Sequence, residues 1–319
     1  MLRRMDLLPF VADSRLPAAR PFTTAEARES GVSAEALRRL CRQGQLRHVL
    51  RGVYVDATVR DDLLTRSIAL SLVVADTAVV TDETAGWLHG AAVLPPGQHL
   101  HLPPVKVFQL PGNTRVRRRG VHGGERGFVA RDLQTVHGVL TTTPLRTALD
   151  LGRLTPRDRA LGSMDSLMRA GDFDRDDLLR ETSRFKGFRG VIQLRALAPL
   201  VDPRSESPGE SALRLRWLDA GLPAPQLQVP VVDEVGLPRF YGDLGLPALR
   251  FLAEYDGADF HTTPSDTSYD EQRRSWLRAH GWVVVVLTRR EVFTHPQRAA
   301  DLLRRGHAEA RMRARHTAA

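Results

Sequence analysis

The chain has 319 residues and a formal net charge of +9, which favours a polyanionic partner, DNA first, although a GC-rich coding bias toward arginine would give the same balance. Its single cysteine, Cys41, excludes a disulfide framework or a cysteine-based zinc site within one chain. No apolar run is long enough for a membrane span or a signal peptide, so we expect a cytoplasmic protein without membrane contact. The length predicts two or three domains, and the elements described below predict an α/β protein, α+β overall, divided into residues 1–60, 61–202 and 203–319.

The first 60 residues are typical of a winged helix-turn-helix. Thr23 and Glu26 predict a capping box at the start of a short helix, and Ser33 begins a second helix that ends before Gly44. The strands "LRHVL" and "VYVD" then predict a tight basic hairpin. A second helix of this kind presents basic side chains to the major groove, and arginines reach phosphates and guanine edges. The predicted DNA contacts are Arg38, Arg39, Arg42, Arg47 and Arg51.

The segment "GVSAEALRRLCRQGQLRHVLRGVYV" resembles the N-terminal winged-helix module of the AbiEi-type antitoxins of abortive-infection systems. The resemblance covers about the first 55 residues and extends in weaker form to about residue 150. It implies DNA binding, often to the protein's own promoter, and makes a cognate toxin a candidate partner. Docking of the same module on another protein is the alternative.

Residues 61–202 predict an α+β region that extends the antitoxin-like part. "TDETAGWLHGAAVLPP" predicts a helix that ends at Gly90, and a further helix starts at Thr143-Pro144 with three more helical segments after it. "HLHLPP", "VFQLP", "TRVRRRGVHGG" and "GVLTTTP" predict short strands. The scattered histidines have no helix-turn spacing, so we expect no metal site in this region.

Residues 203–319 predict a mixed sheet flanked by helices. "VDPRSESPGE" is rich in proline, serine and charge, and predicts an exposed domain boundary. Ser207 and Glu210 then predict a capping box for a helix that runs to Gly221. A strand, an acidic hairpin, a helix, the buried strand "WVVVVLT" and a basic helix from Pro296 to His316 follow, in the order α-β-β-β-α-β-α.

The hairpin "GDLGLPALRFLAEYDGADFH" carries acidic residues, which strands usually exclude. A two-residue turn at Pro247-Ala248 places Asp243 opposite Leu252, and strand alternation then puts Asp243, Glu254 and Asp256 on one face. Gathered carboxylates repel one another unless a cation compensates, so we expect a divalent-metal site for Mg²⁺ or Mn²⁺. The alternative is a solvated turn whose acids pair with arginines.

Residues 203–300 resemble the small endonuclease-like domains related to very-short-patch-repair endonuclease, within the PD-(D/E)XK superfamily. The resemblance rests on "ESALRLRWLDAGLPAPQLQV", on the acidic hairpin and on "DEQRRSWLRAHGWVVVVLT". It implies a restriction-endonuclease-like fold and hydrolysis of DNA phosphodiesters with one or two Mg²⁺ ions. It also implies catalytic residues at Glu210, Asp243, Glu254, Asp256 and His261, of which Asp243, Glu254 and Asp256 would be metal ligands.

One position departs from this resemblance, because Asp256 stands where the superfamily usually has a lysine that activates water or stabilises the phosphate. His261 as general base, with Arg273 and Arg274 against the phosphate charge, would replace that lysine. Two functions stay open. One is a metal-dependent DNA endonuclease of phage defence or DNA repair, with a repair protein as a candidate partner. The other is a non-catalytic transcriptional regulator or antitoxin with a degenerate nuclease fold. Three acids on one strand face favour the nuclease, since a pure DNA binder gains nothing from repelling phosphate.

Overall fold

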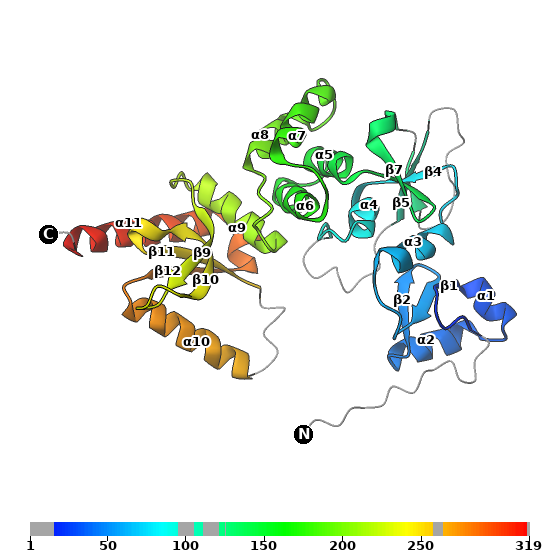
Figure 1. The fold of residues 1–319 in the computed structure, drawn as a ribbon, viewed down its shortest axis with the longest axis horizontal. Coiled ribbons are helices and arrows are strands. Elements are labelled where there is room, and N and C mark those ends of the chain that lie inside the picture. The colour runs from blue at the N-terminus through cyan, green and yellow to red at the C-terminus, as the bar shows by residue number, and fades with distance from the viewer. Residues whose placement is uncertain (1–15, 95–104, 111–120, 125, 258–263, 318–319) are drawn as a thin grey trace. The chain divides into compact units, whose positions relative to one another are not determined.

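The computed structural model of this protein describes residues 16–94, 105–110, 121–124, 126–257 and 264–317. The chain forms two compact units that divide between Thr147 and Ala148 (Figure 1). Helices and mixed sheets occur in the chain together, which confirms the predicted α+β class. Within the described ranges, no helix is both long enough and apolar enough to cross a membrane.

The first module has the element order predicted for a winged helix. Thr23 Oγ1 accepts a hydrogen bond from the Glu26 amide at 3.1 Å, and Glu26 Oε2 accepts one from the Thr23 amide at 2.8 Å, so the capping box is confirmed. Leu37 and Leu40 of the second helix are buried against Phe22, which turns the opposite face of that helix outward. The elements are β1 (Phe22–Thr23), α1 (Thr24–Glu29), α2 (Ala34–Arg42), β2 (Leu46–Leu50) and β3 (Val53–Asp56), with sheet order β1-β3-β2.

The rest of the first unit is built on a five-stranded sheet of order β6-β5-β4-β8-β7. Its helix α4 ends at Leu88 and is followed by Gly90 with φ of +78°, close to the predicted end. The predicted strand "HLHLPP" and the basic run "TRVRRRG" lie outside the described residues. The elements are α3 (Leu63–Ser71), β4 (Ala78–Val80), α4 (Asp82–Leu88), β5 (Val105–Gln109), β6 (Val121–His122), β7 (Leu133–Val136) and β8 (Val139–Thr142).

The second unit begins with a group of helices that continues directly into the C-terminal part. The stretch around residue 202 is not the exposed linker that the sequence predicts, because Val201, Asp202 and Ser205 are buried. Gly162 of α6 sits so close to α9 that an added Cβ would lie 3.2 Å from the Cα of Pro208. The helices are α5 (Pro144–Leu154), which starts just before the division, α6 (Arg157–Ala170), α7 (Arg175–Thr182), α8 (Val191–Leu197) and α9 (Pro208–Asp219).

A buried ion pair joins α6 to α9. Arg214 Nη2 donates to Asp165 Oδ2 at 2.5 Å, with both side chains almost fully buried. Asp165 Oδ1 accepts a hydrogen bond from the Asp202 amide at 2.8 Å, which fixes the connecting segment to the same point. On the outside of the helix pair, Arg157 forms two bonds with Asp219, at 2.7 and 2.8 Å. The end of the predicted middle region and the predicted C-terminal domain therefore form one compact unit, and the compact division lies near residue 147.

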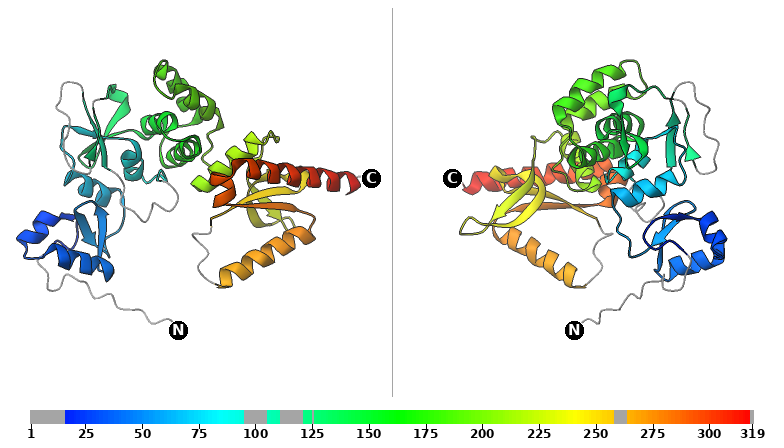
Figure 2. Two further views of the ribbon diagram at one scale, coloured as in Figure 1. Left: turned by 180° about the vertical axis from the view of Figure 1, so that it is seen from behind. Right: turned by 45° about the vertical axis from the view of Figure 1, so that its right-hand side comes forward.

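The second unit ends in a four-stranded mixed sheet of order β12-β11-β10-β9, in which only β11 and β12 are parallel. Figures 1 and 2 show this sheet with α10 on one face and α9 and α11 on the other. Trp217 of α9 stacks on Phe251 of β11 at 5.0 Å between ring centroids, at the centre of the α9–α11 side. The elements are β9 (Gln226–Val232), β10 (Pro238–Leu246), β11 (Phe251–Asp256), α10 (Pro264–Ala279), β12 (Val283–Thr288) and α11 (Pro296–Thr317).

The turn of the acidic hairpin differs from the predicted two-residue turn. A 3₁₀ segment covers Pro247–Leu249, and Arg250 then adopts a left-handed conformation with φ of +49°. The longer turn shifts the register by two residues, so that Leu244 pairs with Ala253. Asp243 therefore comes opposite Glu254 and not opposite Leu252. A shift of two residues by itself would keep every side chain on its predicted face. The alternation of β10 breaks at Asp243, however, because added Cβ atoms at Gly242 and Gly245 would both meet Leu252.

Candidate functional site

The acidic hairpin opens into a fork at the point where its acids lie. Pairing between β10 and β11 ends at Leu244 and Ala253, whereas β10 continues along β9 as far as Pro238 and β11 continues along β12 as far as Asp256. Asp243 stands in this opening, and its Oδ2 accepts a hydrogen bond from the Tyr255 amide at 2.7 Å. The Asp243 carboxylate thus takes the place of the β10 carbonyl that would otherwise accept from the Tyr255 amide. We call Asp243, Glu254, Glu210 and Gln228 the sheet fork.

Glu210 reaches the sheet fork from the first turn of α9. Ser207 caps this helix by accepting from the Glu210 amide at 3.1 Å. The Glu210 carboxylate does not accept from the Ser207 amide as the predicted capping box requires; its Oε2 accepts from the Glu206 amide at 2.8 Å and from Gln228 Nε2 at 3.1 Å. The side chain is therefore held by both the helix entry and strand β9.

Gln228 was not predicted as a site residue, and its sequence surroundings give no signal for it. Its φ of +48° is a left-handed conformation that a glutamine in a strand rarely adopts. Leu227 packs on the α9–α11 side of the sheet while Val229, two residues on, packs on the α10 side. The left-handed residue thus reverses the alternation of β9 and directs its amide to Glu210, a strain of the kind found at functional sites.

The sheet fork concentrates negative charge in a poorly solvated place. Burial raises the pKa of Asp243 to about 6, with a further rise from the charge of Glu254. Burial and the charge of Asp243 raise the pKa of Glu210 to about 7. Arg273 of α10 supplies a compensating charge, since its Nη2 lies 2.7 Å from Glu254 Oε1 and also 2.7 Å from the Tyr241 carbonyl.

The three-carboxylate metal cage does not form among the described residues. In that part of the chain, no group of three or more His, Cys, Asp or Glu side chains is placed to hold a metal ion. Asp256 pairs instead with Arg274 at 3.2 Å. Arg273 and Arg274, predicted to face DNA phosphates, are both engaged with these acids. The predicted general base, His261, lies outside the described residues.

The winged-helix module presents four of its five predicted arginines to solvent. Arg38, Arg39 and Arg42 are exposed on the outer face of α2, and Arg51 is exposed at the tip of the hairpin. None of these four has a carboxylate partner among the residues that the structure describes. Arg47 differs, because it pairs with Asp61 at 3.3 Å and donates to the Val59 carbonyl at 3.0 Å. Arg47 therefore holds the end of the hairpin in place.

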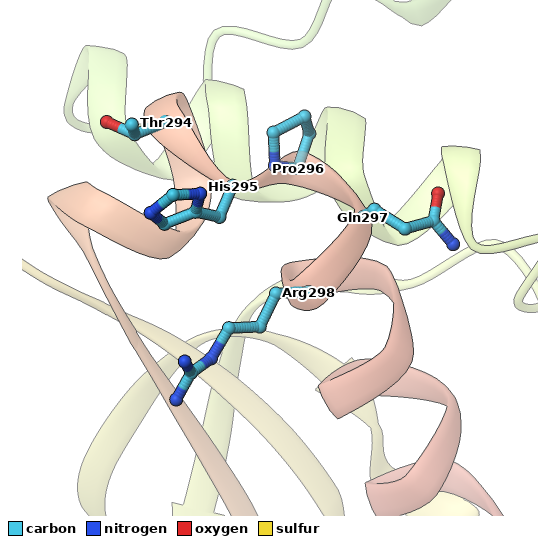
Figure 3. Close-up of a pocket in the computed structure, with 5 residues that line it drawn as sticks. All are labelled: Thr294, His295, Pro296, Gln297 and Arg298. Carbon is cyan, nitrogen blue, oxygen red and sulfur yellow. The ribbon is translucent and has the colours of Figure 1, made fainter.

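A separate hollow of about 450 Å³ lies where α11 begins. Figure 3 shows its lining, and no residue of the sheet fork belongs to it. All five lining side chains are exposed, so no buried polar group is directed into the hollow, and we assign no ligand to it. The lining residues are Thr294, His295, Pro296, Gln297 and Arg298.

Two family models match this chain. Residues 18–55 match "Transcriptional regulator, AbiEi antitoxin", which covers the winged-helix module. Residues 77–200 match "AbiEi antitoxin C-terminal domain". The AbiEi part of the predicted resemblance is thus confirmed and reaches further along the chain than about residue 150. The resemblance of residues 203–300 to endonuclease-like domains stays a prediction.

Two curated relatives come from two strains of Mycobacterium tuberculosis and are named uncharacterized proteins MT2308 and Rv2248. Each is 32% identical over 272 residues, which cover 85% of this chain and 96% of the relative. An alignment of that length must extend well into the part beyond residue 200, so the relatives share more than the two matched domains. The chain therefore belongs to one protein family with these two mycobacterial proteins, and within that family it carries both AbiEi antitoxin domains.

Proposed function

We propose that this protein is a DNA-binding transcriptional regulator of the AbiEi antitoxin type. The observation that carries the proposal is the outer face of α2, where Arg38, Arg39 and Arg42 are exposed without carboxylate partners among the described residues. Arg51 on the adjoining hairpin extends the same positive surface. A helix whose arginines lack carboxylate partners in the described ranges suits insertion into the major groove. The basic hairpin beside it suits contacts with the neighbouring phosphates.

A cognate toxin is the second partner that the family suggests.

The Arg38→Ala, Arg42→Ala double variant of the full chain is expected to bind DNA upstream of its own coding sequence about tenfold to a hundredfold more weakly. Each lost phosphate contact should also flatten the plot of log affinity against log salt by about 0.9. The measurement is fluorescence anisotropy across a salt series. Arg28→Ala is the control for each of the two single variants, because it removes one exposed arginine from α1 and is expected to have a smaller effect. An unchanged slope in the double variant would favour a protein-docking surface.

A second candidate function is metal-dependent hydrolysis of DNA phosphodiesters in the C-terminal part, which the sheet fork favours. Asp243 and Glu254 stand opposite each other in an opened sheet, and Mg²⁺ is commonly bound through one or two carboxylates with water and phosphate in its other positions. Two hard oxygen donors therefore suit the ion, and a bound Mg²⁺ would polarise a phosphate and lower the pKa of a water. Glu210, held by a hydrogen bond from Gln228, would add a third carboxylate beside Asp243 and Glu254. His261 would accept the proton of the attacking water.

Asp243→Asn is expected to remove divalent-ion binding and plasmid nicking together, while leaving the fold intact, because an asparagine oxygen still accepts from the Tyr255 amide. Wild type should gain several degrees of thermal stability in Mn²⁺ or Mg²⁺, and the variant should gain none. Asp233→Asn, on the exposed tip of the neighbouring hairpin, is the control. If neither ion stabilises wild type and no plasmid is nicked, the sheet fork is not a nuclease site and the regulator function stands alone.

A further inference from the structure

The C-terminal helix α11 has a basic outer face that neither the winged helix nor the sheet fork explains. The helix has 22 residues and is therefore about 33 Å long. Its inner face is fixed to the sheet through small residues; at Gly306 an added Cβ would lie 2.5 Å from Val285 Cγ2 and 2.9 Å from Phe251 Cε2. Since that contact leaves no room for rotation of the helix, the outer face is held in one orientation.

Arginines on the outer face divide into two groups. Arg304 pairs with Asp301 at 3.0 Å and Arg313 pairs with Glu309 at 2.6 Å, both within the helix. The other group is exposed and has no carboxylate partner in the described ranges; it consists of Arg305, Arg311 and Arg315. At 3.6 residues per turn, these three lie within about 120° of one another around the helix axis.

The helix dipole accounts for only part of this group. Cations are favoured in the last turn of a helix, where the carbonyl groups are unpaired, and Arg315 is in that turn. Arg311 and Arg305 lie farther from the end, outside the reach of that effect. Three like charges held on one rigid face repel one another, so the arrangement favours a partner that carries closely spaced negative charges.

We propose that Arg305, Arg311 and Arg315 form a second DNA-binding surface, which contacts the phosphate backbone without reading sequence. The three residues span about 15 Å of helix, and one DNA strand presents a phosphate about every 3.4 Å along its axis, so a single strand can meet all three. A lipid surface fits less well, because an interfacial helix needs an apolar face and α11 has buried its own against the sheet. Met312 is the one large apolar side chain exposed on the described part of α11. The inference rests on the proposed function, since it adds a contact to the same kind of partner.

The test measures binding of the full chain to a random-sequence 30-base-pair duplex, which is roughly three times as long as α11, and to DNA upstream of its own coding sequence. The Arg305→Ala, Arg311→Ala, Arg315→Ala variant is expected to bind both duplexes about tenfold to a hundredfold more weakly, with a salt slope smaller by about 2.7. Its preference for the upstream DNA should be unchanged. Circular dichroism verifies that the variant is folded, which is expected because all three side chains are exposed.

Two single variants give a matched comparison on the same helix. Arg311→Ala removes an unpaired arginine and Arg313→Ala removes a paired one, so Arg311→Ala should weaken binding several-fold more. Equal effects, or no change in the triple variant, would overturn the proposal. If the winged-helix variant loses binding while the triple variant does not, the proposed function survives and this surface fails. Loss of binding only to vesicles that contain phosphatidylserine would identify a membrane surface and overturn the DNA assignment.

Discussion

Asp165→Ala is expected to lower the free energy of unfolding by about 3–5 kcal/mol, because it leaves the buried guanidinium of Arg214 without its countercharge. The same change leaves the Asp202 amide without its acceptor in the connecting segment. Burial raises the pKa of Asp165 above its usual value in spite of the arginine 2.5 Å away, so desolvation outweighs the attraction at this carboxyl. An ion pair of this kind is costly to break, although it need not be stabilising as a whole.

Urea unfolding followed by tryptophan fluorescence gives the measurement, because Trp217 is buried on α9. Arg157→Gln is the matched control. It removes the exposed pair with Asp219 on the same two helices, where the expected loss is below about 1 kcal/mol. The Asp165→Asn, Arg214→Met double variant should recover much of the loss, since no charge is then left buried. A loss below 1 kcal/mol for Asp165→Ala would show that α6 and α9 do not depend on this contact.

The same experiment bears on domain organisation. The sequence predicts a boundary near residue 202, because proline, serine and charge gather there. Asp165 and Arg214 are 49 residues apart, and no local pattern reveals that they meet and bury the segment between them. If the two helices unfold together, wild type should show one transition for residues 148–319, and protease should not cut first between Val201 and Gly209.

Short-range features of the chain were predictable where they depend on neighbouring residues. The capping box of Thr23 and Glu26 and the outward arginine face of α2 follow from spacing alone. The placement of Glu254 and Asp256 on one face also follows from strand alternation, and both acids pair with arginines of α10. The turn itself did not follow, since the left-handed Arg250 belongs to a residue type that rarely adopts that conformation.

The electrostatic partners of the sheet fork could not be read from the sequence. Glu254 pairs with Arg273 across 19 residues, and Glu210 meets Gln228 across 18 residues. These contacts depend on how α9 and α10 pack on opposite sides of the sheet. They also give part of the reason why the hairpin tolerates its acids: Arg273 and Arg274 compensate Glu254 and Asp256, while Glu210 and Asp243 stay undercompensated.

The raised pKa values of Glu210 and Asp243 determine how the free energy of unfolding changes with pH. Between its ordinary pKa of 4.5 and its folded value of about 7, Glu210 binds a proton in the folded state but not in the unfolded chain. The contribution of this group to stability therefore falls as pH rises through that interval, by about 1.4 kcal/mol per pH unit. Asp243, raised to about 6, acts in the same direction over a lower interval. Burial lowers the pKa values of His48 and His89, and these two groups change stability in the opposite direction as pH rises. The contribution of Glu210 is therefore measured by comparing wild type with a variant.

Glu210→Gln isolates the effect, because glutamine has the shape of the protonated acid and does not titrate. At pH 4.5 the variant and wild type should be similar in stability, whereas at pH 8 the variant should be more stable by about 3 kcal/mol. Urea unfolding of both proteins at the two pH values measures the difference, and exposed Glu234→Gln, in the turn between β9 and β10, is the control. If the sheet fork binds a divalent cation, Mn²⁺ at pH 8 should stabilise wild type and reduce the advantage of the variant, because the ion supplies the missing countercharge. A variant that is less stable than wild type at both pH values would mean that Glu210 serves mainly as the acceptor for Gln228 and the Glu206 amide, and that its charge is already compensated.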